Sequence, residues 1–478
     1  MKKMFFKYKN AALPLKAAFW FSVCSIIQQA VNFLTVPLFT RILSSEEYGI
    51  WTLYQSWQSI LNIIVGLNLA SGGFNSALIK YEDRRNEYVS SMVGLLTMLC
   101  LIWWCVSLYG QNLFIRVTHL KTVFLYTMYI DIFLNGIYTL WAQQRKFEFK
   151  YKAIIIITIF LTVVSPLLSL CVTLHCQNHI NARILSNTIV NGVIIFVIIV
   201  ELLKSGKKIY NKQFWLYALS FNIPLIPHYL SQIILNQSDR IMIANMCGDD
   251  LAAYYSIAYS IAAITTVFVT SIMSAFCPWL FQKIKTRNIE NIHGKANILA
   301  ILFALLSIGT ILVGPEVLNI MGPIEYQQAK WVIPPVSASI YFLFLYNMYA
   351  NIEFYFEKKK MIAVGSMIAA ISNIILNYLC IRKFGYIAAG YTTLICNIIY
   401  TIGHYTFSKY IQKTQQIKLS IYNERFLWGM GIIVSFFAII SNILYMNNRI
   451  RYIFIGIFIV IGIVFRKIII RIVRIKME

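Results

Sequence analysis

The segment VNFLTVPLFTRILSSEEYGIWT, Val31–Thr52, decides how the rest of the chain is interpreted. It passes from an apolar stretch through a proline and Arg41 into a polar turn with two glutamates, and then becomes apolar and aromatic again. A second segment with the same plan, LNQSDRIMIANMCGDDLAAYYS, lies about 203 residues later at Leu235–Ser256. Each segment is typical of two membrane helices joined by a short turn, so the pair predicts two comparable halves.

The composition predicts an integral membrane protein. The 478 residues are 59% hydrophobic and 13% charged, with a mean hydropathy of +0.67, whereas soluble domains contain about 25% charged residues. The net charge of +24 does not indicate a nucleic-acid partner, because the basic residues form short clusters between apolar stretches. The nine cysteines contain no CxxC pair and are interpreted as packing residues.

Apolar stretches of sufficient length predict fourteen membrane-spanning helices. About 20 helical residues cross the roughly 30 Å hydrocarbon core of a bilayer. The second, seventh and tenth stretches are interrupted by polar residues or prolines. The predicted spans are 17–40, 48–70, 89–109, 121–142, 153–174, 182–203, 214–244, 252–280, 296–314, 331–356, 362–381, 389–407, 425–445 and 452–470.

Basic residues provide a test of this count that is independent of hydropathy. If both termini lie on the same side of the membrane, that side carries 32 of the 42 lysines and arginines. Cytoplasmic loops are enriched in basic residues, so this distribution predicts two cytoplasmic termini and an even number of spans. The connecting loops are short, which leaves no room for an extramembrane domain.

The two hairpins also predict an internal duplication. An offset of 203 residues places Gln29 on Gln232 and Glu47 on Asp250. Each half then contains six spans, so both halves enter the membrane from the same side and the repeats are parallel. The predicted parts are an N-terminal six-helix lobe at 1–205, a C-terminal six-helix lobe at 206–420, and two additional helices with a basic cytoplasmic tail at 421–478.

Polar side chains follow one face of the first predicted helix and one face of the seventh. Gln29 and Asn32 share a face of the first, and Gln232 and Asn236 share a face of the seventh. Such residues usually face protein or water rather than lipid. Interhelical hydrogen bonding would explain any one of them. Their presence in both halves favours the lining of a translocation cavity.

Charged residues within predicted spans are the second group of candidates. Placing a charge at the bilayer centre costs about 2.5 to 3.5 kcal/mol on insertion scales, so each needs a partner or a function. We predict that Arg41 and Arg240 line a cavity that receives a phosphate or diphosphate, which arginine contacts with two parallel hydrogen bonds. We predict that Asp131 and Asp239 modulate the positive electrostatic field of these two arginines or exchange an ion. An interfacial anchor at Arg41 and a local Asp239–Arg240 ion pair are the alternatives; Glu353 also lies within a span.

Other motifs exclude functions or indicate bends. His175, Cys176 and His179 resemble a metal site but lack a fourth ligand, so no metal is predicted. No Walker loop or GxSxG motif is present, and we therefore predict a protein that is not an enzyme and has no cofactor. Prolines within or at the ends of spans predict kinks or hinges; they are Pro37, Pro166, Pro224, Pro227, Pro278, Pro334 and Pro335.

Four segments of the chain carry a family resemblance. They are PLFTRILSSEEYGIW at Pro37–Trp51, SDRIMIANMCGDDLAAYYSIAYSIA at Ser238–Ala262, GPEVLNIMGPIEYQQAKWVIP at Gly314–Pro334 and NIILNYLCIRKFGYIAAGYTT at Asn373–Thr393. Through these segments the chain resembles the polysaccharide repeat-unit flippases, which handle O-antigen or capsule units and belong to the multidrug/oligosaccharidyl-lipid/polysaccharide exporter superfamily. One departure is Leu251–Tyr254, LAAY, where the family commonly has a glycine before the aromatic residue.

This resemblance implies an all-α membrane protein with two six-helix bundles around a central cavity that opens alternately to each side. It implies a polyprenyl-diphosphate-linked oligosaccharide as cargo, moved to the periplasmic leaflet of the bacterial inner membrane for O-antigen, lipopolysaccharide or capsule synthesis. A polysaccharide polymerase and a chain-length regulator are the implied partners besides membrane lipids, and an H+ or Na+ gradient is the implied energy source. A multidrug or cation exporter and a peptidoglycan-precursor flippase share the fold. A membrane polysaccharide polymerase is the alternative from another class, but a large catalytic outer loop would be expected for it.

Overall fold

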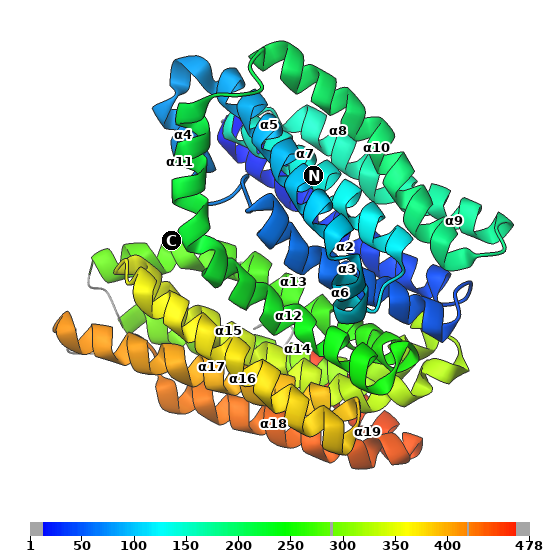
Figure 1. Cartoon of the computed structure of the whole chain (residues 1–478). Coiled ribbons are helices and arrows are strands. Elements are labelled where there is room, and N and C mark those ends of the chain that lie inside the picture. Colours follow the sequence, from blue (N-terminus) through cyan, green and yellow to red (C-terminus); the bar gives the residue numbers. More distant parts are fainter. Residues whose placement is uncertain (1–12, 287–289, 418–419, 465–478) are drawn as a thin grey trace, which may run out of the picture. The chain divides into compact units, whose positions relative to one another are not determined.

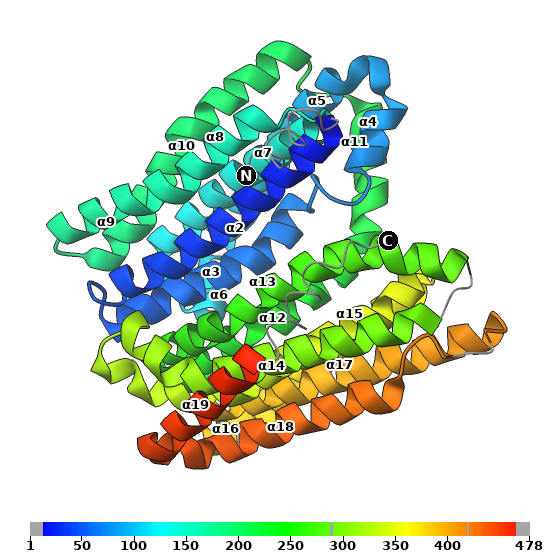
Figure 2. The same ribbon diagram turned by 180° about the vertical axis from the view of Figure 1, so that it is seen from behind.

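The computed structural model describes residues 13–286, 290–417 and 420–464. Within these ranges the secondary structure is helical and contains no strand, which confirms the predicted all-α class. The chain forms two compact units that divide between Gln237 and Ser238 (Figures 1 and 2). The lobe boundaries predicted at 205 and 420 stay predictions, as does the cytoplasmic placement of the termini, which lie outside the described residues.

The first unit is a bundle of long helices with short ones at its edges. Within it α10 packs against α9, α7 and α5, and α3 packs against α7 (Figure 1). The helices are α2 (Leu13–Phe39), α3 (Ser45–Gly66), α4 (Phe74–Lys80), α5 (Arg85–Tyr109), α6 (Gln111–Thr118), α7 (Thr122–Phe147), α8 (Tyr151–Ile159), α9 (Ser165–His175), α10 (His179–Gly206), α11 (Lys212–Asn222) and the first half of α12 (Ile226–Cys247).

Helix α3 begins where the sequence turns polar. The Ser44 hydroxyl accepts from the Glu47 backbone N–H at 3.1 Å, and the Glu47 carboxylate accepts from the Ser44 N–H at 3.0 Å. This capping box satisfies two backbone donors that the first helical turn cannot pair. The helix ends at Leu67, whose φ of 49° is left-handed. Side chains within the segment Val31–Thr52 itself therefore determine where α3 begins.

Two predicted spans are interrupted in the first unit. The span 153–174 contains a π-helical segment, Phe160–Val164, between α8 and α9, and Pro166 is the second residue after it. A proline cannot donate to the preceding turn and clashes with its carbonyl, and a wider turn relieves both problems. The span 214–244 is divided by a 3₁₀ turn at Ile223–Leu225, which contains Pro224 and is followed by Pro227. The regular α-helix is thus interrupted near these prolines, while the predicted kinks or hinges stay predictions.

The second unit consists of the rest of α12 and seven further helices. Helix α17 packs against both α15 and α16, and α18 packs against α14 and α15 (Figures 1 and 2). Pro334 and Pro335 lie in the first turn of α15, where a missing N–H costs nothing, so they start the helix rather than bend it. The helices are α13 (Asp249–Lys285), α14 (Glu290–Met321), α15 (Ile333–Tyr355), α16 (Lys359–Phe384), α17 (Ile387–Thr414), α18 (Glu424–Met446) and α19 (Asn448–Val464).

The turn between α12 and α13 uses a different glycine from the one the family pattern places before the aromatic residue. Gly248 has a φ of 119°, a conformation that side-chain-bearing residues rarely adopt. Its N–H donates to the carbonyls of Ile243 and Ala244, both at 3.2 Å. Asp249 and Asp250 then form the first turn of α13, where negative charge is favoured by the helix dipole. The missing glycine at Leu251–Tyr254 therefore does not disturb the turn.

Ten helical segments of the described chain are long and apolar enough to cross a membrane. The other predicted spans correspond to α3, α12 and α17, whose helices carry more polar residues, and to α19, of which 17 residues are described. The mean hydropathy of the first three helices is too low for them to be counted, because polar side chains lie among their apolar ones. The multi-pass membrane fold is therefore shown, and the count of fourteen spans stays a prediction.

Candidate functional site

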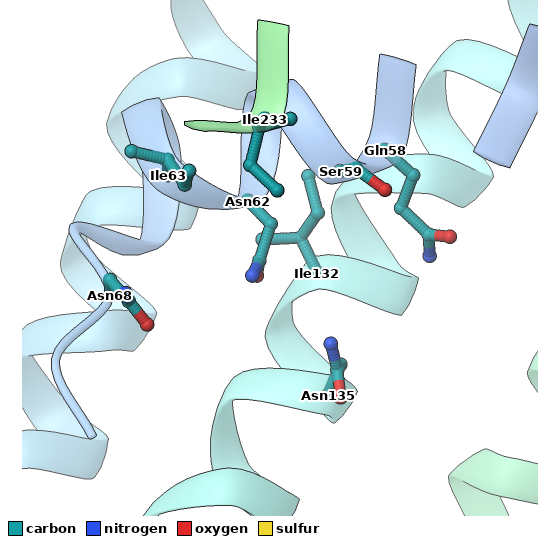
Figure 3. A pocket seen from close by; sticks show the side chains of 8 residues that line it. All are labelled: Gln58, Ser59, Asn62, Ile63, Asn68, Ile132, Asn135 and Ile233. Carbon is teal, nitrogen blue, oxygen red and sulfur yellow. The ribbon is translucent and has the colours of Figure 1, made fainter. Parts of the chain in front are cut away.

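A pocket of about 250 Å³ lies in the first unit between α3, α7 and α12 (Figure 3). Asn62 from α3 and Asn135 from α7 extend into the same space, and Ile233 from α12 covers one side. No formally charged side chain lines it. The lining residues are Gln58, Ser59, Asn62, Ile63, Asn68, Ile132, Asn135 and Ile233.

This carboxamide pocket presents neutral polar groups, and its remaining walls are apolar. Each asparagine or glutamine amide supplies two N–H donors and an oxygen that accepts two hydrogen bonds. Sugar hydroxyls both donate and accept, so they match the two kinds of hydrogen-bonding group in each amide. The volume is slightly below the 300 to 1,000 Å³ usual for small-molecule sites. The arrangement can therefore hold part of a hydroxyl-rich ligand.

Sequence reasoning missed this pocket. None of its lining residues is among the predicted site residues, and no candidate was chosen from the second span. A signal was available, because Gln55, Ser59 and Asn62 recur at spacings of four and three residues along α3. That spacing places polar groups on one side of an otherwise apolar helix.

Asp131 is buried in the first unit at 6% exposure on α7. The Tyr54 hydroxyl of α3 donates to its Oδ2 at 2.6 Å, and the Thr188 hydroxyl of α10 donates to its Oδ1 at 2.7 Å. The carboxylate therefore joins three helices through charge-assisted hydrogen bonds. The predicted role of Asp131 in tuning the field or exchanging an ion stays a prediction.

Asp239 is buried more deeply, at 1% exposure on α12 in the second unit. It accepts hydrogen bonds from Tyr255 at 2.6 Å, from Thr393 at 2.8 Å and from Asn373 at 3.1 Å. The Asn377 amide of α16 also donates to it. All four partners are uncharged, so Asp239 is a carboxylate held by neutral donors.

The two aspartates share part of their surroundings. Tyr255 lies 201 positions after Tyr54, and Thr393 lies 205 positions after Thr188. Both separations are close to the offset of 203 that aligns the two hairpins. Each unit thus supplies a tyrosine and a threonine from comparable helices to one carboxylate. The carboxylate itself comes from non-equivalent helices, α7 in the first unit and α12 in the second.

The other predicted site residues are distributed over both units. Arg41 is exposed in the first unit and donates from Nη1 to the Pro37 carbonyl at 2.7 Å. Arg240 lies in the second, with its guanidinium carbon 4.5 Å from the centroid of the Tyr259 ring. Gln29 and Asn32 are exposed on α2. Asn236 is exposed on α12 and donates to the backbone carbonyl of Gln232 at 2.7 Å, while the predicted polar lining on this helix stays a prediction.

Arg183 is a buried cation that sequence reasoning missed. It lies on α10 at 9% exposure, and its guanidinium carbon is 3.1 Å from the Phe39 ring centroid and 4.2 Å from that of Trp51. Aromatic faces attract cations more strongly where water is excluded. The available signal was a single arginine within the predicted span 182–203. This residue joins α10 to both helices of the first hairpin.

Comparison with known proteins gives family-level matches. A family model described as "Polysaccharide biosynthesis protein" matches residues 15–284, and a model described as MatE matches 224–379. The "Lsg locus putative protein 1" of Haemophilus influenzae is 25% identical over 369 residues, which cover 73% of this chain and 86% of that protein. An "Uncharacterized membrane protein" of the same organism is 23% identical over 360 residues, covering 71% and 84%.

Solved structures share the fold at low identity. The lipid II flippase MurJ in its inward closed conformation superposes with a TM-score of 0.69 and 15% identity, covering 94% of this chain and 99% of that one. An inward-facing multidrug resistance MATE transporter of the MOP superfamily gives 0.64 and 12%, covering 84% and 100%. Identities this low establish the architecture alone.

Proposed function

The chain belongs to the polysaccharide biosynthesis protein family of multi-pass membrane transporters, and we propose that it flips a polyprenyl-diphosphate-linked oligosaccharide from the cytoplasmic to the outer leaflet of the bacterial inner membrane. The cargo would be the repeat unit of a surface polysaccharide, either O-antigen or capsule. A polymerase and a chain-length regulator would then act on the delivered units. Alternating access would be the transport mechanism.

The carboxamide pocket is the observation that carries this proposal. Its four amides and one hydroxyl suit the hydroxyl groups of a sugar, and its isoleucines suit the apolar faces of the ring. A multidrug exporter of cations would be expected to present carboxylates to its ligand. Asp131 and Asp239 instead lie buried among neutral donors. The pocket therefore favours a neutral saccharide over an organic cation.

The diphosphate of the cargo requires positive charge, which we assign to Arg41 and Arg240. A guanidinium contacts phosphate oxygens through two parallel N–H donors. Asp131 and Asp239 would tune this field or exchange a coupling ion. The polar residues of α2 and α12 would complete the lining; they are Gln29, Asn32, Gln232 and Asn236.

A second candidate is a flippase for the peptidoglycan precursor. The observation in its favour is the fold similarity to the lipid II flippase MurJ. Such a cargo also combines a diphosphate with sugars, so the pocket alone does not separate the two functions. Depletion of the protein separates them. Loss of surface polymer in growing cells supports the repeat-unit flippase, and lysis with accumulated lipid II supports the alternative.

The pocket is tested by complementation of a deletion strain. Asn62→Leu with Asn135→Leu should strongly reduce long surface glycan and cause lipid-linked repeat units to accumulate, because two amides are replaced by groups of similar size that cannot form hydrogen bonds. The measurements are glycan gels and lipid extraction, with immunoblots for protein level. Asn319→Leu, at an exposed position of α14, is the control. Normal polymer in the deletion strain itself would contradict the proposed function.

A further inference from the structure

Glu353 of α15 and His404 of α17 form a fully buried pair in the second unit. Both side chains are 0% exposed, and Glu353 Oε1 lies 2.7 Å from His404 Nδ1. The second carboxylate oxygen, Oε2, and the second ring nitrogen, Nε2, have no hydrogen-bond partner among the described residues. Buried polar atoms are nearly always paired, so two orphan atoms on one pair require an explanation.

The walls around this pair are aromatic and small. The rings of Tyr346 and Tyr400 each have their centroids 4.8 Å from that of His404. Gly365 of α16 faces the orphan nitrogen so closely that a Cβ there would lie 2.7 Å from Nε2. The imidazole is therefore held on three sides, with its second nitrogen directed at backbone.

The titratable groups around the pair determine whether its charge is balanced from outside. Tyr346 of α15 and Tyr400 of α17 are the titratable side chains that contact the imidazole, and α16 presents Gly365 and Ser366. Within the described part of the chain, His404 is the charged or titratable partner that contacts the Glu353 carboxylate, and neither side chain forms an ion pair with any other residue there.

One bound proton makes such a pair neutral. If the imidazole is neutral and no further proton is bound, Glu353 is a buried carboxylate without a balancing charge. If two further protons are bound, the carboxyl group is neutral and His404 is a buried imidazolium without a balancing charge. An uncompensated buried charge costs several kcal/mol. The enclosed pair therefore retains a single proton on the carboxyl oxygen or on the ring nitrogen. It can release this proton to water only when its surroundings open.

The position of the pair provides a route for that proton. Glu353 lies in the last turn of α15, and its carbonyl accepts from the Lys358 N–H at 2.9 Å. Gly365 is six residues from the start of α16, which corresponds to about 9 Å along a helix. The connection and the first residues of α16 carry Lys358, Lys359 and Lys360, and this side is predicted to be cytoplasmic. A small shift of these helix ends would connect the orphan atoms to that side.

We propose that the Glu353–His404 pair is a binding site for one proton and that this proton is exchanged in each transport cycle. The inference rests on the proposed transport function and names the coupling ion. Proton binding takes the pair from one negative charge to none, and release returns the proton to water. The neutral pair favours the closed arrangement of α15, α16 and α17, and loss of the proton favours opening.

Proton binding itself is tested without any cargo. Full-length protein in lipid nanodiscs should show a pH-dependent signal from the pair, either a carboxyl C=O band in infrared spectra or a shift of the His404 ring ¹⁵N resonances. The double variant Glu353→Gln, His404→Gln should lose this signal. Glu424→Gln should retain it, because Glu424 is a partly exposed carboxylate of the same unit whose oxygen lies 2.5 Å from Lys409 Nζ. A wild-type protein without such a signal would overturn the proposal.

Coupling is tested in proteoliposomes that contain lipid-linked oligosaccharide and an internal pH dye. The wild type should flip the lipid faster under an imposed proton gradient and move protons as it does so. The double variant stays neutral and cannot release a proton, so it should flip the lipid more slowly than the wild type, without a response to the gradient and without proton movement. Proton movement equal to wild type in the double variant would refute the proposal, as would flipping by the wild type without proton movement.

Failures of the two proposals give different results. If the wild type does not flip the lipid at all, the proposed function fails, and the spectroscopic experiment still decides whether the pair binds a proton. If the double variant does not fold, Glu353→Gln alone replaces it, because a glutamine amide keeps a hydrogen-bonding group at His404 Nδ1. Elution from a sizing column and thermal unfolding identify a folded variant.

Discussion

Asp131 and Asp239 show how a buried carboxylate is stabilised without a cation. Each accepts hydrogen bonds from hydroxyls on other helices, and Asp239 also accepts from two asparagine amides. A hydrogen bond to a charged group contributes about 1.5 to 3 kcal/mol, more than a bond between neutral groups. These side chains therefore fix the relative positions of α3, α7 and α10 in one unit and of α12, α13, α16 and α17 in the other.

Removing one of these donors should destabilise the second unit. Tyr255→Phe keeps the ring but removes the O–H that donates to Asp239, so a loss of about 1 to 3 kcal/mol is expected. Thermal unfolding of purified protein measures it. Tyr259→Phe is the matched control, because it keeps the ring that lies beneath Arg240. Equal melting temperatures for wild type and Tyr255→Phe would contradict the assigned hydrogen bond.

The sequence predicts which residues are unusual better than it predicts their partners. Asp131, Asp239 and Glu353 are identifiable because a charge within an apolar span is costly. Their partners are not, since Tyr54, Tyr255 and His404 are ordinary residues until the helices are packed. The hydrogen bond between Thr393 and Asp239 joins positions 154 residues apart, and no local pattern encodes it. Arg183 was missed for the opposite reason, because a single charge near the start of a span resembles an interfacial residue.

At the level of single helices, the positions of spans follow from hydropathy, while their interruptions follow from local backbone chemistry. Every predicted span coincides with a helix or a bent pair of helices, although the end of the last span lies outside the described residues. Pro166 was predicted to kink its span, but the distortion is a π-helical segment that precedes the proline. Which wider turn relieves a proline depends on neighbouring packing, and sequence reasoning does not supply it.

The start of α3 makes a prediction about a helix end. Ser44→Ala removes the hydroxyl that caps the Glu47 N–H, and loss of an N-cap side chain costs about 1 kcal/mol. Hydrogen exchange of the first turn of α3 should therefore become faster, with a small fall in thermal stability. Ser45→Ala alters the adjacent serine, which is not part of the capping box, and should have little effect. Unchanged exchange in Ser44→Ala would show that packing alone holds this turn.

At the level of the whole molecule, the duplication predicted from two hairpins has a counterpart in buried chemistry. The tyrosine and threonine that hold a carboxylate recur at nearly the same offset in each unit. The carboxylates do not recur, because one comes from α7 and the other from α12. The two halves thus share the tyrosine and threonine donors and differ in the helix that supplies the carboxylate. That difference would allow the units to have separate roles, with saccharide contact in the first and ion exchange in the second.

The arginines test whether both units contribute to one transport site. Arg41 belongs to the first unit and Arg240 to the second, and each ends a predicted polar face, on α2 and α12. If both contact the diphosphate, Arg41→Ala with Arg240→Ala should abolish surface glycan while protein level and membrane insertion stay unchanged. Arginine-to-lysine changes should restore transport only in part, because lysine keeps the charge but cannot form two parallel hydrogen bonds to phosphate.

Complementation of a deletion strain measures this, and Lys207→Asn serves as the control. Lys207 is an exposed residue that follows α10, and asparagine tolerates its φ of 56°. The Lys207→Asn change also removes one positive charge, but at a position outside the predicted polar faces of α2 and α12. Surface glycan should therefore remain normal. A fully active Arg41→Ala, Arg240→Ala protein would show that these arginines act as interfacial anchors. The positive charge for the diphosphate would then have to come from other residues, and the buried Arg183 of the first unit would be the next to test, because its guanidinium lies against the rings of Phe39 and Trp51.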